Sequence, residues 1–184
     1  MNKAWGHFKT ITRHRHLVMK QCFRVGLYRN GLLHDLSKYS PTEFRIGAKY
    51  YQGTRSPNAV EREVCGHSTA WMHHKGRNKH HFEYWTDLVP GTVHYGPVPM
   101  PTRYFVEMVM DRIAACKVYK GENYTDGAAL EYLLSARDSK DLHPDTYEKL
   151  LFVLTMLKEK GEQETFCFIR EVVLKEVPFS QWQA

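Results

Sequence analysis

The sequence predicts an all-α protein, a single-domain helical bundle, and three observations support this fold class. Apolar residues recur at helical spacing along most of the chain. Strong helix start signals accompany this spacing, as at Ser40-Pro41 and Ser56-Pro57. The 184 residues, 42% of them apolar, are enough for one core, and no repeat or long linker divides them. We therefore expect one domain over residues 1–184.

The first predicted helix covers residues 8–29. Its apolar side chains have helical spacing: Ile11, Val18, Cys22 and Val25. His14 falls on this apolar stripe, whereas His16 does not. A second, short helix is expected at residues 32–36.

The next two predicted helices have clear start signals. The first begins with a capping box, which is formed by Ser40, Pro41 and Glu43. It should end near residue 51. Ser56-Pro57 begins another helix, which we expect to continue to about His74. The polar run at 76–79 then predicts a turn.

Several Pro and Gly residues between 87 and 101 interrupt regular secondary structure and predict a long loop there. Long loops beside a functional site often serve as lids. A short extended segment at 93–95 fits within this loop. The clearest helix of the chain follows at residues 102–120, and Gly121 ends it. Three more helices are expected, at residues 128–137, 144–160 and 162–177.

Composition and charge narrow the classes of partner and compartment. Lys and Arg number 26 against 20 Asp and Glu, a net charge of +6, which favours anionic substrates such as phosphate esters and nucleotides and is compatible with nucleic acid. No apolar run is long enough for a membrane span, and the N-terminus lacks the apolar segment of a secretory signal, so we expect no membrane partner. The four cysteines are dispersed, which predicts reduced thiols, packed as small hydrophobes, in a cytoplasmic protein. Nothing in the sequence fixes the oligomeric state.

The chemistry of the chain centres on His34-Asp35, which follows an apolar stretch. A buried imidazole and a buried carboxylate both need a partner. His14 and Asp111 pose the same problem, because each lies on the apolar face of another predicted helix. Such residues suit one or two divalent transition metal ions, Mn, Fe, Co, Ni or Zn, bound between helices. The alternative is a set of core residues that are satisfied by hydrogen bonds alone.

Three segments resemble the signature of the HD-domain superfamily of metal-dependent phosphohydrolases: His14-Arg15-His16-Leu17-Val18, Leu32-Leu33-His34-Asp35-Leu36-Ser37-Lys38 and Val109-Met110-Asp111-Arg112-Ile113. The resemblance covers about residues 11–118 and implies a helical bundle of the HD-domain type. The additional C-terminal helices expected at 128–177 lie outside it. The chain also resembles an uncharacterised bacterial and phage group within this clan, which is marked by HDLSKYSPTEF and HHKGRNKHHFEYW.

The resemblance also implies roles for individual residues. Four of them would hold a principal metal ion: His14, His34, Asp35 and Asp111. His74, with His80 or His81, would hold a second ion, and which of His73, His74, His80 and His81 are ligands stays open. Lys38 and Asp35 would act in catalysis, in a reaction in which a metal-activated water attacks a nucleotide or another phosphate ester. An ordinary surface lysine at the end of a helix is the alternative interpretation of Lys38.

The polar turn after His74 offers candidates for binding the phosphate: Lys75, Arg77 and Asn78. A solvated polar turn explains these residues equally well. Two other functions stay open beside the hydrolase. One is a non-haem di-iron oxygenase of HD-like type, because histidine-rich ligation suits iron. The other is a non-enzymatic, basic nucleic-acid-binding protein.

Overall fold

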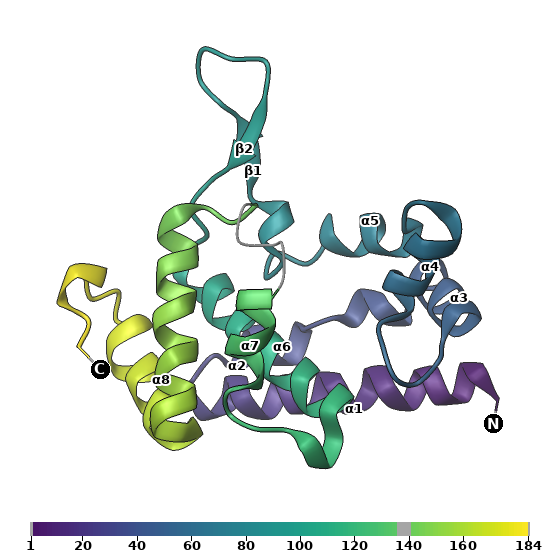
Figure 1. Ribbon diagram of the computed structural model, residues 1–184, viewed down its shortest axis with the longest axis horizontal. Helices are drawn as coiled ribbons and strands as arrows, with labels where there is room; N and C mark the ends of the chain where they lie inside the picture. Colours follow the sequence, from purple (N-terminus) through teal and green to yellow (C-terminus); the bar gives the residue numbers. More distant parts are fainter. Residues whose placement is uncertain (1, 136–140, 184) are drawn as a thin grey trace.

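The computed structural model describes residues 2–135 and 141–183. Within these residues the chain forms eight α-helices, several short 3-10 segments and one two-stranded sheet (Figure 1). The predicted all-α fold is confirmed. None of the described helices is long and apolar enough to cross a bilayer.

The first helix, α1 (Lys3–Arg24), is shifted from its predicted position at 8–29. It begins earlier because the side chain of Asn2 accepts a hydrogen bond from Ala4 N and caps the helix. It ends earlier because Gly26 has a φ of +85°. Its predicted apolar stripe is buried as expected, and His14 is buried with it.

The predicted short helix at 32–36 is wrong, because the chain breaks in its middle. Helix α2 (Tyr28–Leu33) ends at His34, and a 3-10 turn, η1 (Leu36–Tyr39), follows. Between them Asp35 has a left-handed backbone, with a φ of 54°. A left-handed residue ends a helix and turns the chain, so His34 and Asp35 lie in a corner rather than on a helix.

Helix α3 (Pro41–Tyr50) begins at the predicted cap, where Ser40 Oγ accepts a hydrogen bond from Glu43 N. The predicted helix from residue 57 to His74 is wrong, because it is divided into α4 (Pro57–Cys65) and α5 (Thr69–Lys75). Gly66 ends α4 with a φ of +78°, and Ser68 caps α5. The turn predicted at 76–79 is present.

The predicted loop at 87–101 contains a small hairpin. After η2 (Phe82–Tyr84), strands β1 (Thr86–Leu88) and β2 (Tyr95–Pro97) pair antiparallel, with Asp87 opposite Gly96. In Figure 1 this hairpin extends away from the helices. The predicted extended segment at 93–95 overlaps β2 only at its last residue.

Helix α6 (Thr102–Lys120) has the predicted bounds, and Gly121 caps it and begins η3 (Gly121–Asn123). Helix α7 (Ala128–Ser135) follows; its predicted end at residue 137 lies outside the described residues. Two predicted helices correspond to α8 (Pro144–Phe168), whose backbone is non-helical at Gly161. The chain continues through a π-helical turn, η5 (Ile169–Val173), to η6 (Phe179–Gln181).

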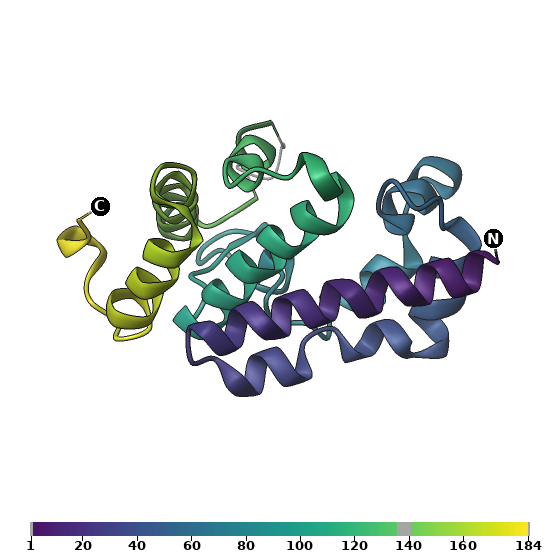
Figure 2. The same ribbon diagram turned by 90° about the horizontal axis from the view of Figure 1, so that it is seen from below.

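The hydrophobic core occupies one half of the molecule. Its buried side chains come from the C-terminal half of α1 and from α6, α7, α8 and η5, and none comes from α3, α4 or α5. Figure 1 and Figure 2 show α1 running along both halves, with α3–α5 beside its first turns and α8 near its end. The two halves are therefore linked by α1, by η1 between α2 and α3, and by the segment between α5 and α6.

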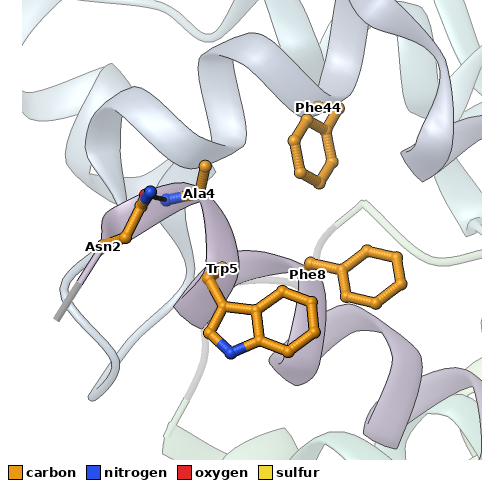
Figure 3. Close-up of a pocket in the computed structure, with 5 residues that line it drawn as sticks. All are labelled: Asn2, Ala4, Trp5, Phe8 and Phe44. Atoms are coloured by element: carbon orange, nitrogen blue, oxygen red, sulfur yellow. Dashed lines mark hydrogen bonds between the residues drawn. The ribbon is translucent and has the colours of Figure 1, made fainter.

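Two further features lie outside the centre of the molecule. A pocket of about 360 Å³ at the start of α1 is lined by Trp5, Phe8 and Phe44, together with Asn2 and Ala4 (Figure 3).

All four cysteines are free thiols. Only Cys22 is fully buried, while Cys65 and Cys167 are exposed, so the prediction that all four pack as small hydrophobes is wrong.

Candidate metal centre

Helices α1 and α6 bring His14 and Asp111 together with the corner that carries His34 and Asp35. The Nε2 atom of His14 lies 2.8 Å from Oδ1 of Asp111 and 3.7 Å from Oδ2 of Asp35. The Nε2 atom of His34 lies 3.5 Å from the same Asp111 oxygen. One ligand atom from each of these four residues lies within 4.8 Å of the others. The four residues form the first ligand set.

A second ligand set lies on the other side of Asp35. The Oδ1 atom of Asp35 is 3.2 Å from Nε2 of His74 and 3.4 Å from Nε2 of His80. His81 completes the set, again with all ligand atoms within 4.8 Å of one another. Its ring centroid is 4.1 Å from that of His80. Asp35 belongs to both sets, so its carboxylate lies where two ions would share it.

Five buried atoms that face the two ligand sets have no hydrogen-bond partner. They are Nε2 of His34, His74, His80 and His81 and Oδ1 of Asp35. Leaving one polar atom in this state costs roughly 1–3 kcal/mol, so five of them in one place need a common partner. A divalent ion accepts lone pairs from imidazole nitrogen and carboxylate oxygen together. The residues present therefore fit one or two such ions.

The Nδ1 atoms of three of these histidines, His34, His74 and His80, are held by two glutamates. Oε1 of Glu107, on α6, lies 2.9 Å from Nδ1 of His34 and 3.1 Å from Nδ1 of His80. On α3, Glu43 lies 2.7 Å from Nδ1 of His74 and, through its other oxygen, 2.7 Å from Nδ1 of His73. A carboxylate that accepts the Nδ1–H leaves Nε2 free to bind a metal.

The charges in the centre follow from these contacts. Burial raises the pKa of Glu107, but hydrogen bonds from His34 and His80 outweigh it and lower that pKa to about 2. Burial lowers the pKa of His81, and the neighbouring His80 and His74 lower it further. His81 is thus held as a neutral imidazole, which is the form that binds metal.

Neither Glu107 nor Glu43 was identified from the sequence. Glu107 lies four residues before Asp111, one helical turn away, which was the available signal. The sequence pattern places Glu43 at the end of a capping box, yet its carboxylate is turned to the histidines of α5 rather than to the backbone of Ser40. His73 thus contacts Glu43 and belongs to neither ligand set.

Lys38 lies next to the shared carboxylate, with Nζ 2.5 Å from Oδ2 of Asp35. Burial lowers the pKa of this lysine, but Asp35 and Asp111 outweigh it, so the pKa is raised and the side chain is a cation. Lys38 also lines a cavity of about 1010 Å³. It places a fixed positive charge where the centre meets that cavity.

The cavity has His14, Asp111, His80 and His81 in its wall. Further cations line it: Arg55, Arg62, Arg112 and Lys120. The apolar face of α6 that carries Asp111 also lines this cavity, through Met108, Ala115 and Val118. Met108 of this face belongs to the hydrophobic core, whereas Ala115 and Val118 are half-buried. Most of the core side chains of α6 lie on its other faces: Phe105, Val106, Val109, Met110, Ile113 and Ala114.

The structure places the turn residues elsewhere. Lys75, Arg77 and Asn78 are absent from the lining of the cavity. Asn78 donates hydrogen bonds from Nδ2 to Ser37 Oγ and to the carbonyl oxygen of His74, and Arg77 donates to the carbonyl oxygen of His73. These contacts satisfy the end of α5, so the phosphate-binding role predicted for this turn has no support in the geometry.

A family model, the family of unknown function DUF5662, matches residues 3–156, which include every residue of both ligand sets. No curated protein and no solved structure matches the chain. Because the family model covers most of its length, the chain belongs to DUF5662.

Proposed function

We propose that this protein is a metal-dependent phosphohydrolase of the HD-domain type, acting in the cytoplasm on a nucleotide or another phosphate ester. The observation that carries the proposal is the convergence of five buried, unpartnered ligand atoms beside a large cavity. The cationic lining of that cavity suits an anionic substrate, and four free thiols suit a reducing compartment.

Each group of residues has its own role in the proposed reaction. The first ligand set holds one ion and the second set holds another, with Asp35 common to both. When bound, divalent ions polarise a phosphoryl oxygen and lower the pKa of water. Lys38 offers a positive charge to the negative charge that accumulates on the substrate. The arginines farther along the cavity bind the remaining anionic groups of the substrate.

The test combines metal analysis with an activity panel. Elemental analysis should find transition metal in the purified protein, and chelation should abolish turnover of phosphomonoesters, phosphodiesters and nucleotides assayed with Mn²⁺, Co²⁺ or Ni²⁺. His14→Ala should lose activity, whereas His16→Ala, on the exposed side of the same helix, should keep it. Metal-loaded protein that is inert on every phosphate compound would overturn the hydrolase proposal.

The abundance of imidazole in the centre favours a second candidate, a non-haem di-iron oxygenase, since the two sets together contain five histidines. Iron-loaded protein would then consume oxygen and show a visible absorption band. A nucleic-acid-binding function predicts instead salt-sensitive binding that His34→Ala leaves unchanged.

A further inference from the structure

Glu107 contacts one histidine from each ligand set. Its Oε1 atom is 2.9 Å from Nδ1 of His34, whose Nε2 faces the first set. The same oxygen is 3.1 Å from Nδ1 of His80, whose Nε2 faces the second set. The two rings lie against each other, with centroids 4.4 Å apart. A single carboxylate oxygen thus fixes two rings that point to different ions.

Glu107 is itself held firmly in this position. It is 5% exposed, on a helix whose other faces form the core and the cavity wall. Its second oxygen, Oε2, accepts a hydrogen bond of 2.7 Å from Nδ2 of Asn30, on α2. The carboxylate therefore cannot turn toward one histidine without losing its bond to α2.

The other glutamate of the centre differs in this respect. Glu43 contacts His74 of the second set, but its other partner, His73, belongs to neither set. Glu43 therefore orients one ligand set only, while Glu107 orients a ligand in both.

We propose that Glu107 is a positioning residue that couples the two ion positions, by holding the rings of His34 and His80 in the tautomer and orientation that present Nε2. Binding of an ion at either position then pre-orders a ligand of the other, because both rings share one acceptor. The inference rests on the metal centre proposed above and does not require that the reaction be hydrolysis.

The test measures metal binding in metal-free full-length protein that is titrated with Mn²⁺ or Zn²⁺. Glu107→Gln should weaken binding at both positions about 10–100-fold, the usual effect of losing such a partner. Glu43→Gln should weaken binding at one position only. Glu61→Gln is the matched control, because Glu61 is a buried carboxylate whose partners are Ser68 and Thr69, and it should change neither position.

A spectroscopic readout separates positioning from a general loss of structure. In long-range ¹H–¹⁵N spectra of the Zn²⁺-loaded protein, wild-type His34 and His80 should show a protonated Nδ1 and an unprotonated Nε2, and Glu107→Gln should change both rings. Should that variant fail to fold, Asn30→Ala loosens Glu107 without altering a ligand, and it should weaken both positions to a smaller extent.

Three results would overturn the proposal. One is Glu107→Gln that weakens a single position or none. Another is unchanged tautomers of His34 and His80 in that variant. The last is a wild-type stoichiometry of three ions that falls to two in Glu107→Gln, because Glu107, His34 and His80 would then themselves hold an ion through Oε1 and the Nδ1 atoms. Metal titration does not depend on turnover, so an inert but metal-binding protein would disprove the hydrolase and leave this test intact.

Discussion

The Oδ1 atom of Asp35 faces the Nε2 atom of His74 at 3.2 Å, and neither atom makes a hydrogen bond. Asp35 comes from the corner between α2 and η1, and His74 from α5, so the two meet across the interior of the protein. Two buried polar atoms that lie this close without a hydrogen bond between them are placed as two ligands of one metal ion would be. The predictions below follow from this arrangement and from the cavity beside it.

Removing the charge of Asp35 should disrupt both ion positions. Asparagine tolerates the left-handed backbone of residue 35, so Asp35→Asn changes the carboxylate without straining the chain. We expect at least about tenfold weaker binding at both positions, measured by equilibrium dialysis and elemental analysis. Asp111→Asn, which alters only the first ligand set, should weaken one position. An Asp35→Asn protein that keeps one position at full affinity would contradict a shared carboxylate.

Metal ions should stabilise the fold as well as the site. An ion that binds only the native state, at a free concentration 100 times its Kd, adds about 2.7 kcal/mol to the free energy of unfolding. Urea denaturation with chelator and with added Mn²⁺ measures the difference. His14→Ala should show a smaller increase than wild type, and an identical midpoint under both conditions would argue against ion binding at this centre.

Gly47 and His7 should show strong energetic coupling. A Cβ atom on Gly47 would lie 2.2 Å from Nε2 of His7, so Gly47→Ala should destabilise the protein by about 1–3 kcal/mol. In the His7→Ala background the ring is gone and the residue lies within α3, so the same substitution should stabilise by up to about 1 kcal/mol. A double-mutant cycle read by denaturant unfolding checks this reversal of sign. Equal effects in both backgrounds would refute the contact.

His7 should make stability fall at low pH. Burial, and then Lys38, lower the pKa of its ring from 6.5 to about 4 in the folded state. The unfolded chain therefore binds the proton first as pH falls, so stability is complete above pH 6.5 and declines between 6.5 and 4. The loss approaches about 3 kcal/mol. His7→Gln should lack this part of the decline, and parallel wild-type and variant pH profiles would rule it out.

Lys38→Gln should reduce turnover rather than metal content. The substitution removes a cation beside the shared ligand, and loss of one such stabilising group costs about 10²–10³ in kcat. Elemental analysis should find as much metal as in the wild type. Lys49→Gln, on the last turn of α3 and outside the cavity lining, provides a surface control. Equal turnover of Lys38→Gln and wild type would remove Lys38 from the mechanism.

The fold could be predicted where helices carry unambiguous end signals. Helix α6, with Gly121 at its end, has the predicted bounds. Two of the failures concern glycine within an apolar pattern: Gly26 and Gly66 have positive φ and end helices that the spacing alone would continue. A glycine is tolerated inside a helix at a modest cost, so sequence does not distinguish it from a terminator until tertiary packing selects the conformation.

The centre was partly predictable for a physical reason. His14, His34 and Asp35 lie among apolar residues, where an unpartnered polar group is costly, so their positions stood out. His80 and His81 could not be separated, because the choice depends on the turn after α5, and the structure places both in the second set. The role of Glu107 could not be predicted, because its contacts with His34 and His80 exist only once α6 packs against the corner at residue 35.

The uneven distribution of the core has a consequence for the ion-free chain. Because α3, α4 and α5 contribute nothing to the hydrophobic cluster, they depend on contacts with the first turns of α1 and on the polar centre itself. Segments with so little apolar packing open more readily than the rest of a protein. We expect amide hydrogens of α4 and α5 to exchange with solvent well before those of α6 when ions are withdrawn. Bound ions would therefore stabilise the packing of α3, α4 and α5 against the half of the molecule that contains the hydrophobic core.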